Sequence, residues 1–305
     1  MAPRYRSLSS WLRALFSQPV RKIALDAGLG CPNRDGTVGF GGCIFCNPGG
    51  SGTGAAKHGL SVSDQVDRGI EFLAGRYKVS KFIAYFQSFT NTYGTPEYLK
   101  QIYWAALQRP EIVGLAIGTR PDCLSDGVLD VLSEISDTKL VWVELGLQSA
   151  HDRTLELINR GHNSRDFFET SRRAMSRGLF VVAHIILGLP GESLEDMLMT
   201  AQAIASAGIH GIKLHPLYVI SGTPLEEMYR SGAYVPMTLE ESVEATLSVI
   251  QVLPKDMVIH RLTSDPHREE LVAPKWMLDK RAVRNFLNHE MEKRNIFQGS
   301  KTLGE

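Results

Sequence analysis

The chain has 305 residues, of which 43% are hydrophobic and 22% charged, and this size fits one large α/β domain or two average domains. Its 33 Lys and Arg residues balance its 33 Asp and Glu residues, so the molecule as a whole has no large electrostatic field. No stretch approaches the roughly 18 consecutive apolar residues of a membrane span, so no membrane contact is expected. Four cysteines without a recognisable signal peptide indicate a reducing compartment, and we expect a cytoplasmic location.

The first 21 residues predict a short basic helix. Residues 1–22 contain five basic side chains and no acidic one. Apolar residues recur there at helical spacing, at Leu8, Trp11, Leu12, Leu15 and Phe16. A transit peptide has a similar composition, but this segment runs almost directly into the first expected strand and leaves little to cleave. We therefore expect a helix that packs on the core, with its basic side in solvent or against a phosphate backbone.

Apolar runs alternate with helical patterns from residue 22 onward, which predicts a parallel sheet covered by helices. The expected strands are 22–26, 81–87, 112–117, 140–146, 180–187, 211–218 and 257–262. Helix starts are marked by a capping box at Ser61 and Asp64, by Thr95 before a proline, and by Thr238. A doubly wound sheet and a barrel both satisfy this order.

The end of the chain differs from the repeated strand–helix units. A loop around Asp265 and Arg268 precedes a helix expected over residues 275–294. We interpret residues 263–305 as an extension of one domain, whose core spans 22–262 and whose basic helix spans 1–21.

Three of the four cysteines, Cys31, Cys43 and Cys46, lie within sixteen residues directly after the first expected strand. The four glycines and the proline between them do not favour a helix. Clustered thiols bind soft metal centres as thiolates, and a set of three leaves one coordination position open. A structural zinc site needs four ligands, and neither His58 nor Cys123 has the usual spacing. A disulfide between two of the three cysteines would leave the third thiol unpaired. The three could also be small buried cysteines with only a structural role. An iron–sulfur cluster fits the three clustered thiols better than either alternative.

Polar or glycine-rich segments follow the other expected strands. They are residues 87–90, 118–122, 144–149, 187–192 and 213–217. In both α/β architectures ligands gather at the carboxyl ends of the strands, so we expect these segments and the cysteine loop to form one site.

These segments together resemble the radical S-adenosylmethionine (SAM) superfamily over nearly the whole chain. CIFC at 43–46 is similar to the end of the superfamily's C-x3-C-x2-C motif, although eleven residues (32–42) fill the first gap in place of three. Three segments resemble the elongator-type radical SAM core: RPD at 120–122, ELGLQS at 144–149 and RGH at 160–162. Others resemble the small bacterial YhcC/YtqA-like family: RY at 4–5, LDAG at 25–28, CPNRDG at 31–36, GGCIFC at 41–46 and LVAPKW at 271–276.

The resemblance implies an α/β fold, a partial (β/α)6 TIM-type barrel with a short N-terminal helix and a C-terminal extension. It implies a 4Fe-4S cluster bound by Cys31, Cys43 and Cys46, with SAM chelating the open iron. An electron from a flavodoxin- or ferredoxin-type donor would cleave SAM reductively to a 5'-deoxyadenosyl radical. Elongator-type relatives modify a wobble uridine, so modification of a tRNA base is the leading expectation. A radical SAM enzyme for a small metabolite and a non-catalytic metal or Fe–S protein are the alternatives.

The resemblance also suggests cofactor contacts. Phe45 would shield the cluster and lie by the adenine, and Gln87 and Ser88 stand where a Gly-Gly-Glu motif often receives the SAM amino group. Arg120 would pair with the SAM carboxylate, Gln148 would hydrogen-bond the ribose, and Gly188 would allow close approach to the adenine. Glu144, interior and in need of a partner, and Leu217, at the end of the sixth strand, complete the expected set.

Further residues have weaker assignments. His184 and His215 lie in apolar strands, where a histidine is usually a hydrogen-bonded core residue; His215, at a strand end, is the better candidate to face the substrate. Cys123 is either a structural cysteine or a catalytic thiol. We also expect Asn33, Arg34 and Asp35 to line the mouth of the pocket as part of a lid.

Overall fold

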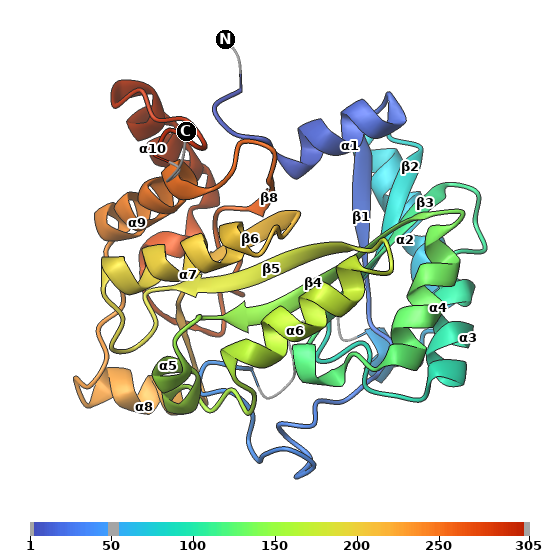
Figure 1. Cartoon of the computed structure of the whole chain (residues 1–305), viewed down its shortest axis with the longest axis horizontal. Helices are drawn as coiled ribbons and strands as arrows, with labels where there is room; N and C mark the ends of the chain where they lie inside the picture. Colours follow the sequence, from blue (N-terminus) through green and yellow to red (C-terminus); the bar gives the residue numbers. More distant parts are fainter. Residues whose placement is uncertain (1–2, 48–54, 302–305) are drawn as a thin grey trace.

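The computed structural model describes residues 3–47 and 55–301, and its centre is a parallel sheet with the strand order β1-β2-β3-β4-β5-β6-β8. The strands are β1 (Val20–Leu25), β2 (Lys81–Phe86), β3 (Ile112–Thr119), β4 (Leu140–Gln148), β5 (Phe180–Leu187), β6 (Gly211–Pro216) and β8 (Val258–Arg261). They agree with the seven expected strands. The sheet curls, and within the described residues no pairing joins β1 to β8, so the barrel is open on that side (Figure 1). The expectation of a partial barrel is confirmed, and the doubly wound alternative is wrong.

Helices cover the outer face of the curled sheet (Figure 1). They are α2 (Val62–Tyr77), α3 (Pro96–Ala106), α4 (Asp126–Ser136), α6 (Ser164–Met175), α7 (Leu194–Ser206) and α9 (Leu239–Val252), and α10 (Lys280–Lys293) packs against α9. The short helices α5 (Asp152–Leu157) and α8 (Pro224–Arg230) pack in a separate apolar cluster with Leu217 and Val219. The capping box at Ser61 and Asp64 is present, and Thr95 and Thr238 cap α3 and α9 as expected. No helix of the described residues is both long and apolar enough to cross a bilayer.

The two faces of each strand carry different kinds of side chain. In β5 the side chains of Val181, Ala183 and Ile185 belong to the large core beneath the helices. The alternate residues, such as His184, point the other way because side chains alternate along a strand. The same alternation separates apolar from polar positions in β4 and β6. The apolar runs of the sequence therefore also contain polar residues, and these form a row on the inner face of the sheet.

The helix α1 (Leu8–Phe16) closes the amino-terminal end of the half-barrel. Leu8 and Leu12 are buried against an inner cluster that contains Trp142, and the ring of Trp11 meets Trp142 edge-on at 6.4 Å. Figure 1 shows α1 at the top, at the opposite end of the sheet from the loop that follows β1. The basic helix is therefore packed on the core as an inner plug.

The C-terminal extension wraps back on this core. The antiparallel strands β7 (Val219–Ile220) and β9 (Leu271–Ala273), which the sequence did not predict, fix its first part. The Gln298 side chain accepts from the Arg6 N–H at 2.8 Å and donates to the carbonyls of Pro254 and Met257. Both ends of the described chain are thus tied to β8.

Candidate active site

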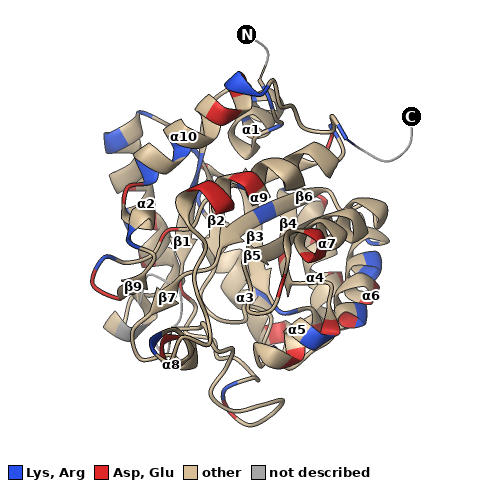
Figure 2. Ribbon diagram, turned by 90° about the vertical axis from the view of Figure 1, so that its left-hand side faces the viewer, with Lys and Arg blue, Asp and Glu red and all other residues tan. Residues whose placement is uncertain are grey.

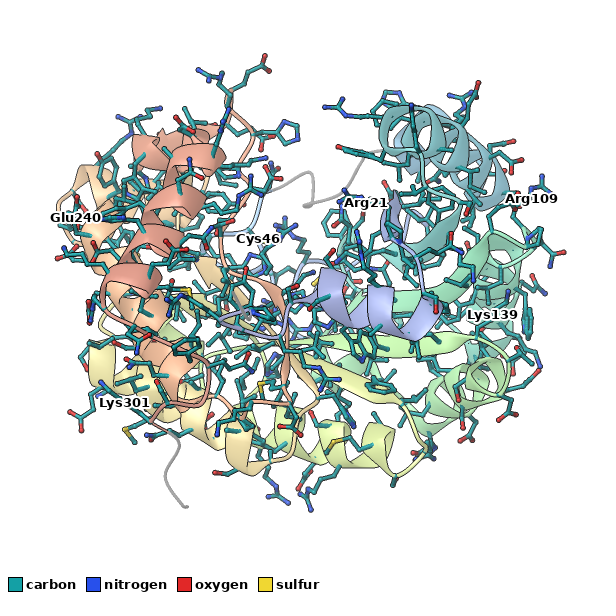
Figure 3. All side chains as sticks on the ribbon, turned by 90° about the horizontal axis from the view of Figure 1, so that it is seen from above. Arg21, Cys46, Arg109, Lys139, Glu240 and Lys301 are labelled. Atoms are coloured by element: carbon teal, nitrogen blue, oxygen red, sulfur yellow. The ribbon has the colours of Figure 1, made fainter. Side chains whose placement is uncertain are left out.

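A cavity of about 770 Å³ lies at the carboxyl ends of the strands. Its walls come from the cysteine loop (Phe45 and Cys46), from several strand ends and from the loop before β9. Figure 3 shows Cys46 near the middle of the molecule seen from above, whereas Arg109, Lys139 and Glu240 lie at its periphery. The volume falls in the range of small-molecule and cofactor sites.

The cysteine loop is held by its own backbone and by Arg34. The Val38 and Gly39 N–H groups donate to the Pro32 carbonyl, and the Arg34 guanidinium donates to the carbonyls of Cys46 and Asn47 at 3.1 and 3.0 Å. Gly42 has a φ of +82°, and a Cβ there would lie 2.9 Å from Nε of Arg34. The loop can thus close over Arg34 only with glycine at this position.

Cys31, Cys43 and Cys46 are free thiols; Cys43 is buried and the other two are half-buried. Burial raises the pKa of the Cys46 thiol, and the neighbouring Cys43 raises it further. A bound metal centre would reverse this by stabilising the thiolate. In the described residues, no three His, Cys, Asp or Glu side chains converge as they would around a single metal ion.

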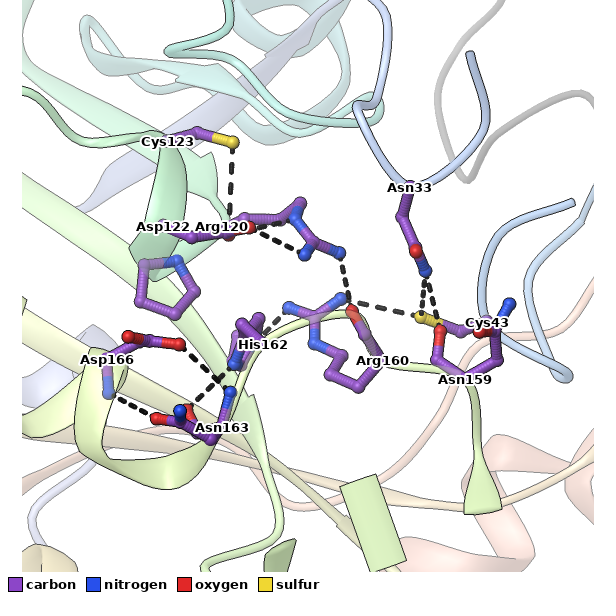
Figure 4. Close-up of polar contacts among 12 residues, drawn as sticks. Asn33, Cys43, Arg120, Asp122, Cys123, Asn159, Arg160, His162, Asn163 and Asp166 are labelled. Carbon is purple, nitrogen blue, oxygen red and sulfur yellow. Dashed lines mark hydrogen bonds and ion pairs between the residues drawn. The ribbon is translucent and has the colours of Figure 1, made fainter. Parts of the chain in front are cut away.

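Two side chains direct donors at the Cys43 sulfur. Arg160 Nη1 lies 3.6 Å and Asn33 Nδ2 3.8 Å from Sγ (Figure 4). Arg160 also donates to the Gly146 carbonyl at 2.7 Å, which fixes its guanidinium between the loop and β4. Such donors stabilise the negative charge of a thiolate ligand, so this environment fits a cysteine-bound cluster.

Arg120 is linked to Cys43 through Arg160, to which it is hydrogen-bonded (Figure 4). Its guanidinium forms two hydrogen bonds with the Asp122 carboxylate, at 2.9 and 2.8 Å, and donates to the Arg160 carbonyl at 2.8 Å. The side chain is buried, and it does not line the cavity. Arg120 thus supports Arg160, and a SAM carboxylate would have to compete with Asp122 for it.

The structure brings together part of the expected cofactor set. Phe45, Gln87, Gln148 and Leu217 line the cavity, as do His184 and His215. Gln148 has a φ of +74°, an uncommon backbone conformation for a residue with a side chain, next to an irregularity in the β4–β5 register.

Other expected residues lie outside the cavity wall. Ser88 is buried with no hydrogen-bond partner for its Oγ among the described residues. Gly188 has a φ of +79°, and a Cβ there would lie 2.7 Å from Cε of Met237. The positive φ of this turn favours glycine at position 188. Asp35 and its neighbours belong to the cysteine loop, but none of residues 33–35 lines this cavity.

Glu144 is fully buried beneath the cavity floor in a network of basic side chains. Its carboxylate contacts Lys213 Nζ, His184 Nε2 at 2.9 Å and the Trp142 indole N–H at 2.9 Å. Burial alone would raise the pKa of Glu144, but the charges of Lys213 and Lys22 hold it well below its usual value. Glu144 is therefore ionised and already paired, with no free oxygen facing the cavity.

Lys213 connects this buried network to the cavity. Its Nζ donates to the Tyr85 hydroxyl at 2.7 Å, and both residues line the cavity. Burial lowers the pKa of Lys213 to about 7. The sequence analysis assigned no role to Lys213 or Tyr85, although a single charged residue in an apolar strand, the signal used for Glu144, also marks Lys213.

The last wall comes from β8 and the following loop. Arg261, Pro266, His267 and Arg268 line the cavity, and Lys280 at the start of α10 pairs with Asp265. The sequence analysis treated this loop as part of an extension, so its contribution to the site was missed.

Cys123 does not line the cavity that Cys46 lines. It lines a second, open hollow of about 690 Å³ beside Asp122 and Asp166. Burial and the Asp122 charge raise the pKa of Cys123 to about 12. The thiol is therefore protonated near neutral pH, which favours the structural interpretation.

Comparisons with known proteins agree with this geometry. The radical SAM superfamily model matches residues 28–204, and the radical SAM C-terminal domain model matches residues 209–293. The uncharacterized protein YtqA of Bacillus subtilis is 39% identical over 296 residues, which cover 97% of this chain and 92% of that protein. The tRNA uridine(34) acetyltransferase of Methanocaldococcus infernus is 32% identical over 156 residues, 50% of this chain and 29% of that protein.

Among solved structures, Methanocaldococcus infernus Elp3 lacking residues 1–46 superposes with a TM-score of 0.72 at 22% identity, covering 92% of this chain and 64% of that one. The shared fold and the two matching domain models confirm the barrel and the C-terminal domain. The chain therefore belongs to the radical SAM superfamily of enzymes, and within it to the YtqA-like family.

Proposed function

We propose that this enzyme binds a 4Fe-4S cluster through Cys31, Cys43 and Cys46 and cleaves SAM beside it to modify a tRNA base. The placement of the cysteine loop against the polar cavity carries the first part, since Phe45 and Cys46 line that cavity directly. When bound, the cluster and SAM supply a carbon-centred radical that abstracts a hydrogen atom from the substrate.

The protein's own residues have supporting tasks in this proposal. Arg160 and Asn33 stabilise the thiolate of Cys43 through their donors, and Arg34 fixes the loop that carries Cys46. Gln148 and Leu217, which both line the cavity, hold the nucleoside part of SAM. Glu144, beneath the cavity, keeps Lys213 and His184 in place in the cavity wall.

The tRNA substrate is supported by the similarity to a tRNA uridine(34) acetyltransferase over half of this chain. A second support is the position of α10. Lys280 lines the cavity, and Arg281 and Arg284 follow it on the first turns of this helix. Figure 2 shows basic residues along α10 and acidic residues on α9. A basic helix beside the mouth offers phosphate contacts to an RNA that inserts one base.

The experiment is the binding of bulk tRNA, by fluorescence anisotropy, to the full-length, cluster-loaded protein at two salt concentrations. We expect affinity to fall steeply between about 50 and 200 mM salt, and replacing both Arg281 and Arg284 by Glu to weaken binding and reduce the salt slope by about one per lost phosphate contact. Arg165→Glu, on the exposed surface of α6, is the control and should bind as the wild type does. Absence of tRNA binding at low salt contradicts the RNA part of the proposal.

A small metabolite is the second candidate substrate. The equal numbers of acidic and basic residues favour it, because most RNA-binding domains have a basic excess. Mass spectrometry of tRNA nucleosides from cells that lack the protein separates the two: a missing modified nucleoside supports tRNA, and an unchanged nucleoside profile supports the metabolite.

A further inference from the structure

The cavity wall formed by β6 and β8 is rich in positive charge. Lys213 and Arg261 are register partners on these neighbouring strands, and both line the cavity together with His215. These three residues are the cationic wall. Within residues 3–47 and 55–301, no hydrogen bond or ion pair joins the Arg261 guanidinium to another residue.

The nearby carboxylates are occupied elsewhere or lie at the rim. Glu144 pairs with Lys213 below the floor, and Asp265 pairs with Lys280. Glu270, on the loop before β9 that also carries the exposed Arg268, lines the same cavity, and no ion pair between described residues joins it to Arg261. Within the part of the chain that the structure describes, Arg261 therefore lines the cavity with no carboxylate paired to it.

The positive charge of Arg261 shifts the pKa values of the ionisable groups around it. After burial, which is the larger cause, the Arg261 charge lowers the pKa of His215, so this ring is neutral near pH 7 and can donate one N–H. The same charge lowers the pKa of Lys213 and Lys22. A guanidinium without a paired anion is costly in a partly dry cavity, and here the only other cationic group of the wall, Lys213, is already paired with Glu144. Its planar fork matches the oxygens of a carboxylate or a phosphate.

We propose that the cationic wall binds an oxyanion of the substrate, a phosphate or a carboxylate, with Arg261 as its main partner and Lys213 and His215 beside it. The inference rests on the proposed function in placing the substrate in this cavity. For an RNA substrate the group is the phosphate next to the target nucleotide. For a metabolite it is an acidic group of the molecule itself.

The test uses the full-length, cluster-loaded protein with SAM under anaerobic conditions, and calorimetric titration with uridine 5'-monophosphate, inorganic pyrophosphate, succinate and uncharged uridine. We expect at least one of the three oxyanions to bind, and Arg261→Gln to weaken that binding by about 10- to 100-fold, the usual effect of losing a charged hydrogen bond. Uridine binding should be the same in both proteins. Arg261→Lys keeps the charge without the fork and should recover part of the affinity.

Arg165→Gln is the matched control, because it removes an exposed arginine of α6 that lies outside this cavity. We expect less than about a threefold change for it. Absorbance of the cluster and circular dichroism show whether each variant is folded and loaded.

The outcomes separate the sources of the anion. Arg261-dependent binding of uridine 5'-monophosphate indicates that the anion is a nucleotide phosphate. Binding of succinate alone supports an anion site at the cationic wall but contradicts an RNA substrate. The inference is overturned if no oxyanion binds the wild type, or if Arg261→Gln binds all three as the wild type does. It is also overturned if Arg261→Gln weakens SAM binding by the same factor in the absence of a probe, because Arg261 then pairs with the SAM carboxylate. Loss of tRNA binding with intact oxyanion binding contradicts only the proposed function.

Discussion

The Arg160 guanidinium donates to the Cys43 sulfur across 3.6 Å, although the two residues are 117 positions apart. Hydrogen bonds to cluster sulfurs are among the factors that set the reduction potential of iron–sulfur centres. A cationic donor stabilises the reduced cluster, which is the more negative form, so Arg160 should keep the cluster easier to reduce.

Replacing Arg160 by Gln should therefore shift the midpoint potential of the bound cluster to more negative values. The measurement is a redox titration followed by electron paramagnetic resonance. Arg160→Lys, which keeps the positive charge, should shift it less. An unchanged potential in a folded, fully loaded Arg160→Gln protein would show that the contact has no electronic role.

The three loop cysteines should each be necessary for cluster binding. Single Ala variants at positions 31, 43 and 46 should lose most of the iron and the visible absorbance of the anaerobically purified protein, because two thiolates hold a 4Fe-4S cluster poorly. Cys123→Ala is the control, since its thiol lines a different hollow. Loss of iron in Cys123→Ala, or retention in Cys43→Ala, contradicts the assignment of ligands.

Glu144 should matter for stability, because it is fully buried and compensates Lys213. We expect Glu144→Gln to cost about 3–5 kcal/mol of unfolding free energy, as when one partner of a buried ion pair is removed. Glu169→Gln, which breaks an exposed pair with Arg165, should leave the melting temperature nearly unchanged. Thermal denaturation of the three proteins tests this.

The pH dependence of that difference follows from the depressed pKa of Glu144. Its contribution is present in full above the ordinary value of 4.5 and is lost as the pH falls through the lower pKa of the folded state. The gap in melting temperature between wild type and Glu144→Gln should narrow below about pH 4. A gap that widens in acid would mean that the carboxyl is protonated in the native protein.

The plug helix α1 offers a matched pair of leucines. Leu12 is 2% exposed inside the barrel end, and Leu15 on the same helix is 53% exposed. Leu12→Ala should cost about 2–5 kcal/mol through its cavity, and Leu15→Ala less than about 0.5 kcal/mol. Equal effects in chemical denaturation would indicate that α1 is not part of the folded core.

Much of the barrel was predictable because each strand carries a strong apolar run between capped helices. Ser61, Thr95 and Thr238 mark helix starts through local hydrogen bonds, which depend on residues three positions apart. The cysteine loop was predictable for the same reason, since its spacing is local.

The sequence was less informative about contacts between distant segments. Glu144 could be recognised as buried, but its pairing with Lys213 depends on the register of three strands. The approach of Arg160 to Cys43 depends on where two loops meet in space. Asp122 lies only two positions from Arg120, but its proximity in sequence does not show that it occupies the Arg120 guanidinium. The short strands β7 and β9 bring the loop with Arg268 over the cavity, and strands of two and three residues leave too little pattern to predict.

The most direct measurement is the release of 5'-deoxyadenosine from SAM by the anaerobically reconstituted protein with dithionite as the electron source. The product is detected by liquid chromatography with mass detection. The wild type should release 5'-deoxyadenosine, and Cys43→Ala, which lacks a ligand, should release none above the background. The same yield from Cys43→Ala, or no product from a fully loaded wild type, would contradict a radical SAM active site in the loop between Cys31 and Cys46.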